Sequence, residues 1–130
     1  MSLEWGANRS VGVDKFDKSH QAMALVINRL ERMAQNNEGG QAALEALDEL
    51  LELAQAHFQE EESELERRGY EDLADHQDEH LNILNEIREL RARQASASDA
   101  PSLEMTDFLA NWMSVHVEET DKRYRRLFDK

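Results

Sequence analysis

The chain has 130 residues, which suits one domain with a modest hydrophobic core. Its 15 Lys and Arg against 28 Asp and Glu give a net charge of −13 at pH 7, and so acidic a surface repels nucleic-acid phosphates and anionic membranes. The sequence contains no cysteine, which excludes disulfides, thiolate metal ligands and cysteine nucleophiles.

The N-terminal residues contain neither a basic segment nor an apolar segment, so we expect no secretory signal peptide there. The longest apolar run covers residues 22–27 and is far too short to cross a membrane. We therefore expect a soluble cytoplasmic protein with no nucleic-acid partner and no membrane partner.

Four amphipathic stretches follow in chain order, separated by the few glycines and the single proline. After an N-terminal arm of residues 1–16, within a single domain of residues 1–130, we expect helices over roughly 17–37, 41–68, 71–94 and 102–128. Asp17 is a suitable N-cap for the first helix. Gly69 is a suitable residue just beyond the end of the second helix.

Each stretch carries apolar residues at alternating steps of three and four, which places them on one face of a helix. In the first stretch this series runs through Phe16, His20, Met23, Ile27, Leu30 and Ala34. Four such faces predict an all-α, antiparallel four-helix bundle with up-down-up-down connectivity.

All five histidines lie on these predicted inward faces. His20 is single, and the others form the patterns His57-x3-Glu61, His76-x3-His80 and His116-x4-Asp121. Two residues four apart share a helix face, so their side chains can reach one ion. The fourth face shifts by one position after His116, so Asp121 lies round the helix from it.

These seven side chains form a candidate metal site. Burying unpaired imidazoles and carboxylates in a small core is costly, and bound cations compensate that cost. Ligands of this kind without sulfur favour iron, manganese or zinc. One tetrahedral zinc takes only about four ligands, so this set favours two ions that share carboxylates. Taken alone, His20 would be an ordinary core histidine and His57 with Glu61 an ordinary helical pair.

Four apolar residues lie within one to four positions of a candidate ligand, namely Phe58, Trp112, Met113 and Val117. We predict that they enclose the metal site, although ordinary core packing explains these positions as well. Four acids also flank the ligands, at Glu60, Glu62, Glu118 and Glu119. For most of them a solvated outer face is the better explanation, and a hydrogen bond to a ligating histidine is the alternative.

The order His, His-x3-Glu, His-x3-His, His-x4-Asp resembles the hemerythrins, and the surrounding sequence resembles the bacterial branch, the bacteriohemerythrins. The matching segments are residues 11–20, 57–62 and 112–124, and the resemblance extends from Trp5 to about Phe128. Leu65 and Glu71 stand where bacterial members often have Met and Pro. Neither position is a candidate ligand, so these departures concern local packing.

The resemblance implies a non-haem di-iron centre, in which one oxygen atom and two carboxylates bridge two iron ions. Carried over to this chain, His76, His80 and His116 hold one iron, and His20 and His57 hold the other. Glu61 and Asp121 become the bridging carboxylates. The iron with two histidines keeps a vacant position, where dioxygen is expected to bind.

The function that this resemblance implies is reversible dioxygen binding for storage, delivery or buffering, by a protein that is not an enzyme. The alternative is a di-iron redox enzyme or sensor acting on peroxide, nitric oxide or iron. The Glu-x2-His motifs typical of oxygen-activating di-iron bundles are absent from the sequence. A third hypothesis is an interaction module with a structural metal. Besides dioxygen, a carrier's partner would be an oxygen-using enzyme, and we expect a monomer or a weak oligomer.

Overall fold

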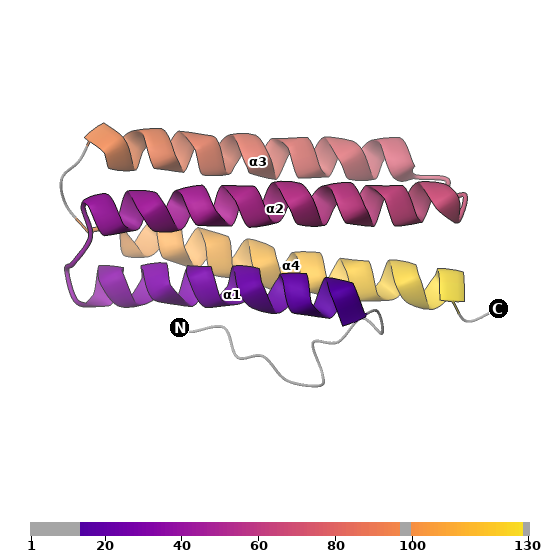
Figure 1. Ribbon diagram of the computed structural model, residues 1–130, viewed down its shortest axis with the longest axis horizontal. Helices are drawn as coiled ribbons and strands as arrows, with labels where there is room; N and C mark the ends of the chain where they lie inside the picture. Colours follow the sequence, from indigo (N-terminus) through magenta and orange to yellow (C-terminus); the bar gives the residue numbers. More distant parts are fainter. Residues whose placement is uncertain (1–13, 97–99, 129–130) are drawn as a thin grey trace.

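The computed structural model describes residues 14–96 and 100–128, with side chains described for residues 16–96 and 100–119. Within these ranges the chain forms four helices: α1 (Asp14–Gln35), α2 (Gln41–Arg67), α3 (Leu73–Ser96) and α4 (Leu103–Phe128). Successive helices run in opposite directions (Figure 1). The predicted all-α, up-down-up-down four-helix bundle is therefore confirmed. Trp5 and most of the predicted N-terminal arm lie outside the described residues.

Helix α2 lies between α1 and α3, and α1 also packs against α4 (Figure 1). The α2–α3 turn and the first residues of α1 lie at one end of the bundle, and the α1–α2 turn lies at the other. None of the described helices is long and apolar enough to cross a lipid bilayer.

Helix α1 begins at Asp14, so the prediction that Asp17 caps its N-terminus is wrong. Phe16 is fully buried in the core, and a helical turn that starts before this residue places its ring inside the bundle. Tertiary packing therefore determines this helix start, rather than the capping preference of Asp17. At its other end, α1 stops at Gln35, and Asn37 follows in the left-handed region with φ of 54°.

The α2–α3 turn is built on Gly69, as the sequence predicts. Gly69 has φ of +70°, and its N–H donates to the Glu66 carbonyl at 3.0 Å. The Tyr70 N–H donates to the Leu65 carbonyl at 3.0 Å, which completes a Schellman motif. Tyr70 then packs against the core. This tight reversal brings the first turns of α3 beside the last turns of α2.

Helix α3 begins at Leu73, two positions after the predicted start at residue 71, and its first hydrogen bond runs from the His76 N–H to the Asp72 carbonyl. Helix α4 begins after Ser102, whose Oγ accepts a hydrogen bond from the Met105 N–H at 3.1 Å. A hydroxyl in this position satisfies a backbone donor that the first helical turn leaves free.

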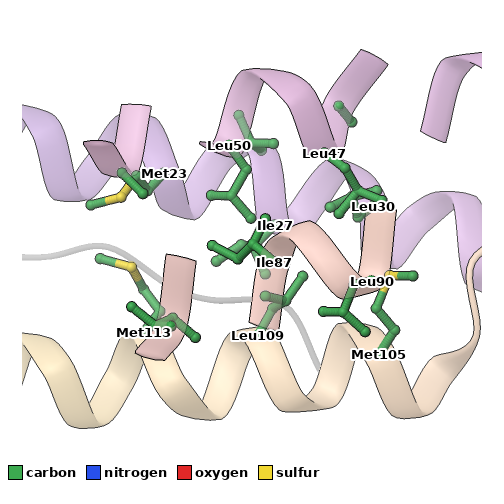
Figure 2. Close-up of a cluster of buried hydrophobic side chains, with 14 of the residues drawn as sticks. Met23, Ile27, Leu30, Leu47, Leu50, Ile87, Leu90, Met105, Leu109 and Met113 are labelled. Carbon is green, nitrogen blue, oxygen red and sulfur yellow. The ribbon is translucent and has the colours of Figure 1, made fainter. Parts of the chain in front are cut away.

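Apolar side chains from all four helices fill the bundle toward the α1–α2 turn (Figure 2). Met23 and Met113 lie at one end of this cluster, and Leu30, Leu90 and Met105 lie at the other (Figure 2). Each such side chain contributes about 1.5–3 kcal/mol when it is fully removed from water. Met23 and Met113 lie at the boundary between the apolar cluster and the histidines, because His20 and His116 lie within one turn of them on the same helices.

Candidate metal centre

Histidines from all four helices meet in the half of the bundle next to the α2–α3 turn. His116 is the most exposed of the five, at 7%, and Glu61 is 0% exposed. The structure therefore buries six of the seven predicted ligands in one place: His20, His57, Glu61, His76, His80 and His116. Asp121 belongs to the backbone of α4, but its side chain lies outside the described residues, so its role stays a prediction.

The Glu61 carboxylate lies at the centre of the histidines. Its Oε2 atom is 2.9 Å from His57 Nε2 and 3.6 Å from His116 Nε2. Its Oε1 atom contacts His76 Nε2 and is 3.3 Å from His80 Nε2. The two oxygens of one carboxylate therefore face different imidazoles, as a carboxylate shared by two ions must.

His57 has more close polar neighbours than hydrogen bonds can satisfy. Its Nε2 atom is 3.0 Å from His20 Nε2, 3.4 Å from His116 Nε2 and 2.9 Å from Glu61 Oε2. An imidazole nitrogen carries either one proton or one lone pair, so it cannot bond all three neighbours. A cation among these atoms would accept their lone pairs together. The donor set therefore fits a bound metal ion.

Burial sets the protonation states that such a metal site needs. Burial, followed by repulsion from His57 and His116, lowers the pKa of His20 to about 2. Burial is also the main cause that lowers the pKa of His116. Burial alone would raise the pKa of Glu61, but its interactions with His116, His57 and His76 hold it well below its usual value. A neutral His20 and a neutral His116 beside an ionised Glu61 are ready to bind a cation.

The ligand atoms divide into two groups that share Glu61. In each group the atoms lie within 4.8 Å of one another. One group contains His20, His57, Glu61 and His116, and the other contains Glu61, His76 and His80. The resemblance instead assigns His116 to the iron of His76 and His80, and that assignment stays a prediction.

Two of the predicted pocket residues lie against the histidines. The Phe58 ring stacks on His80, with centroids 3.8 Å apart and planes 5° apart. The Trp112 ring stacks on His116, with centroids 5.2 Å apart. Met113 and Val117 are buried in the hydrophobic core, which agrees with plain packing, so their part in a pocket stays a prediction.

Sequence reasoning gave no pocket role to Phe16, which is fully buried with its ring edge-on to His57 at 5.7 Å. The available signal was its position one turn before His20 on the same helix face. Glu60, Glu118 and Glu119 are exposed, as predicted for most of the flanking acids. Glu62 is the exception, because its Oε2 atom lies 2.8 Å from His80 Nδ1.

Comparisons with known proteins show which family and which fold this chain shares. Residues 11–128 match the family model of the hemerythrin HHE cation binding domain. A bacteriohemerythrin of Clostridium acetobutylicum is 27% identical over 92% of this chain and 96% of its own length. Another, from Stenotrophomonas maltophilia, is 29% identical over 94% of this chain and 78% of its own. The crystal structure of a hemerythrin mutant, 25% identical, matches with a TM-score of 0.83 over 100% of both chains.

Proposed function

We propose that the buried histidine cluster of this chain, which belongs to the hemerythrin family, holds two iron ions and binds dioxygen reversibly. The observation that carries the proposal is the Glu61 carboxylate, whose two oxygens face separate groups of imidazoles. Bound iron would supply the electrons and the open coordination position that reversible oxygen binding requires.

In this proposal His76, His80 and His116 would hold one iron, His20 and His57 would hold the other, and Glu61 and Asp121 would be shared by both. A donor set of five imidazoles carries less negative charge than the carboxylate-rich sites of oxygen-activating bundles. It therefore stabilises high-valent iron less well. That balance supports binding and release over oxidation of a substrate.

Aromatic side chains form an apolar lining around the site. Phe16 and Phe58 are almost completely buried, and each contacts His57 edge-on or at a tilt. The half-buried Trp112 packs edge-on against Phe58 at 6.0 Å. Together with the buried Met113 and Val117, these rings would keep water and protons away from bound metals, which favours release of intact dioxygen. We propose that the protein stores, delivers or buffers oxygen in the cytoplasm for an oxygen-using enzyme.

A redox enzyme or sensor that uses the same centre is the second candidate. The observation that favours it is Trp112, which is half-buried and stacks on His116. An aromatic ring in this place offers electrons a short route between the protein surface and the site.

The two candidates differ in how the iron-loaded protein responds to air. We expect protein reconstituted anaerobically with ferrous iron to hold two irons per chain. Its visible absorption in air should include a new band that disappears under vacuum and returns over repeated cycles. An irreversible spectral change with release of peroxide would contradict reversible binding and favour the redox candidate. Fewer than two irons per chain would contradict the di-iron site itself.

His76→Ala tests the ligand assignment. His76 is buried and contacts Glu61, so its removal should abolish binding of one iron and with it the reversible band. Gln77→Ala is the matched control, because Gln77 is the next residue on α3 and is exposed. The assignment is wrong if His76→Ala keeps both irons and cycles normally.

A further inference from the structure

One turn of α2 contacts the imidazole of His80, on α3, from three sides. The His80 Nδ1 atom is 2.8 Å from Glu62 Oε2, and its Nε2 atom is 3.3 Å from Glu61 Oε1. The ring face stacks on Phe58 with centroids 3.8 Å apart. Phe58, Glu61 and Glu62 project from neighbouring positions of α2, which lies beside α3 (Figure 1). Three side chains of α2 therefore help to set the orientation of His80, beside its ring contacts with His76 and His116.

The hydrogen bond to Glu62 also decides which nitrogen of His80 carries its proton. An ionised carboxylate only accepts hydrogen bonds, so Nδ1 must be the donor to Glu62. In its neutral form the His80 imidazole has one ring proton, so with that proton on Nδ1 the Nε2 atom is a bare lone pair. This agrees with the geometry at Nε2, which has no hydrogen-bond partner among the described residues although Glu61 Oε1 is near.

We propose that Glu62 is a positioning residue for the metal centre. It holds the proton of His80 on Nδ1, and so presents the Nε2 lone pair toward Glu61 and toward any cation that would bind there. A carboxylate partner on the far nitrogen also makes the ligating nitrogen more basic. The consequence for iron rests on the proposed function, whereas the proton position is a property of the protein without metal.

The neighbouring histidine of α3 has no equivalent hydrogen bond at Nδ1 among the described residues. His76 Nδ1 is 4.0 Å from Glu79 Oε2, which is too long for a hydrogen bond. Glu60, two residues before Glu62 on α2, is exposed. Glu60→Gln is therefore a matched control, since it removes the same charge from the same helix without disturbing His80.

The first experiment reads the proton position in the metal-free protein at pH 7, by long-range proton–nitrogen NMR of the His80 ring. We expect Nδ1 to be protonated and Nε2 to be bare in the wild type and in Glu60→Gln. In Glu62→Leu the proton should move to Nε2, where Glu61 can accept it. Glu62→Gln keeps an acceptor of nearly the same shape, so it should retain most of the Nδ1 form.

Two outcomes of the NMR experiment would overturn the proposal. One is a wild-type His80 that is protonated on Nε2 or on both nitrogens. The other is a Glu62→Leu protein, folded by circular dichroism, in which the proton stays on Nδ1. If Glu62→Leu does not fold, the isosteric Glu62→Gln decides, because a Nδ1 population that does not fall at all would contradict the role of the carboxylate.

The second experiment measures ferrous iron affinity under anaerobic competition with a chelator. Loss of a hydrogen-bonded partner of a ligating histidine costs about 10–100-fold in metal affinity, and we expect Glu62→Leu to show a loss of this size. Glu62→Gln should lose less, and Glu60→Gln should match the wild type. Equal affinity in Glu62→Leu and the wild type would overturn the proposal. If the wild type binds no iron, the proposed function is wrong, and the NMR result alone then decides the role of Glu62.

Discussion

Five imidazoles around one buried carboxylate make the metal-free protein sensitive to acid. An unfolded histidine titrates near 6.5, whereas the pKa of His20 falls to about 2 and that of His116 is also lowered in the folded state. Below 6.5 the unfolded chain therefore binds protons that the folded chain excludes. Glu61, with its lowered pKa, adds stability that is present above its unfolded value of 4.5 and is lost as the pH falls further.

We therefore predict that the free energy of unfolding of the metal-free protein falls as the pH drops from about 6.5 toward 5. Each excluded proton contributes up to about 1.4 kcal/mol per pH unit. Urea denaturation at a series of pH values measures the slope. The variant His20→Leu should show a shallower slope, because one of the excluded protons is gone. A free energy that stays constant between pH 7 and 5 would contradict this prediction.

Met113 tests the pocket at the boundary between the apolar core and the histidines. Its side chain is 1% exposed, so Met113→Ala should leave a cavity and lower the free energy of unfolding by about 2–5 kcal/mol. If the cavity admits water to the proposed di-iron site, the oxygenated protein should also oxidise irreversibly faster, which decay of the reversible band in air would measure. Met113→Leu keeps the volume and should change neither property much. Unchanged autoxidation in Met113→Ala would place Met113 away from the pocket.

At the scale of helices and turns, periodicity in the sequence was sufficient to predict the bundle, because each helix must bury one apolar face. Helix ends were less predictable. Asp17 has the chemistry of a cap, but the burial of Phe16 extends α1 to Asp14. Gly69 was correctly placed, because a left-handed backbone position strongly favours glycine. Local chemistry therefore predicts a helix end only where packing does not override it.

Gly69→Ala isolates the backbone requirement of the α2–α3 turn. A Cβ atom added at Gly69 would meet nothing within 4 Å, so the only cost is that of holding φ at +70°. We expect a loss of about 1–2 kcal/mol in the free energy of unfolding, measured by denaturant titration. Gly69→Asn should lose less, because asparagine tolerates this backbone region better. Equal stability of Gly69→Ala and the wild type would show that the turn adapts at no cost.

Tertiary packing limits prediction of the site from sequence, as it limits prediction of the helix ends. Spacing alone predicted that six candidate ligands lie inside the bundle, because a side chain at a core position of a helix faces the other helices. Spacing could not select Glu62 from the flanking acids, since the direction of its side chain depends on how α2 is rotated against α3. Nor could it divide the histidines between two ions, because that division depends on distances across the bundle. Asp121 remains a prediction on the same terms.

Over the whole molecule, the bundle combines a stable apolar half with a polar half that needs cations. Side chains such as Leu30, Leu47 and Leu109 are completely buried and hold all four helices together. The other half concentrates a carboxylate and five imidazoles, of which His57 Nδ1, His76 Nδ1 and His80 Nε2 have no hydrogen-bond partner among the described residues. The apolar half should keep the metal-free protein folded, unlike small domains that unfold without their metal.

Metal removal should therefore lower the stability of the fold without abolishing it. The candidate ligand atoms come from four helices, so an unfolded chain does not assemble them, and bound iron would stabilise only the folded state. With free iron about 100–1,000 times above its dissociation constant, the gain is about 3–4 kcal/mol for each ion. For a domain of this size, that gain raises Tm by roughly 10 °C or more. Calorimetry of iron-loaded and chelator-treated protein measures the difference. His76→Ala should retain only part of this difference in Tm, because one of the two proposed iron sites would lose a ligand. Identical Tm values for iron-loaded and chelator-treated wild-type protein would mean that the histidines do not bind metal together.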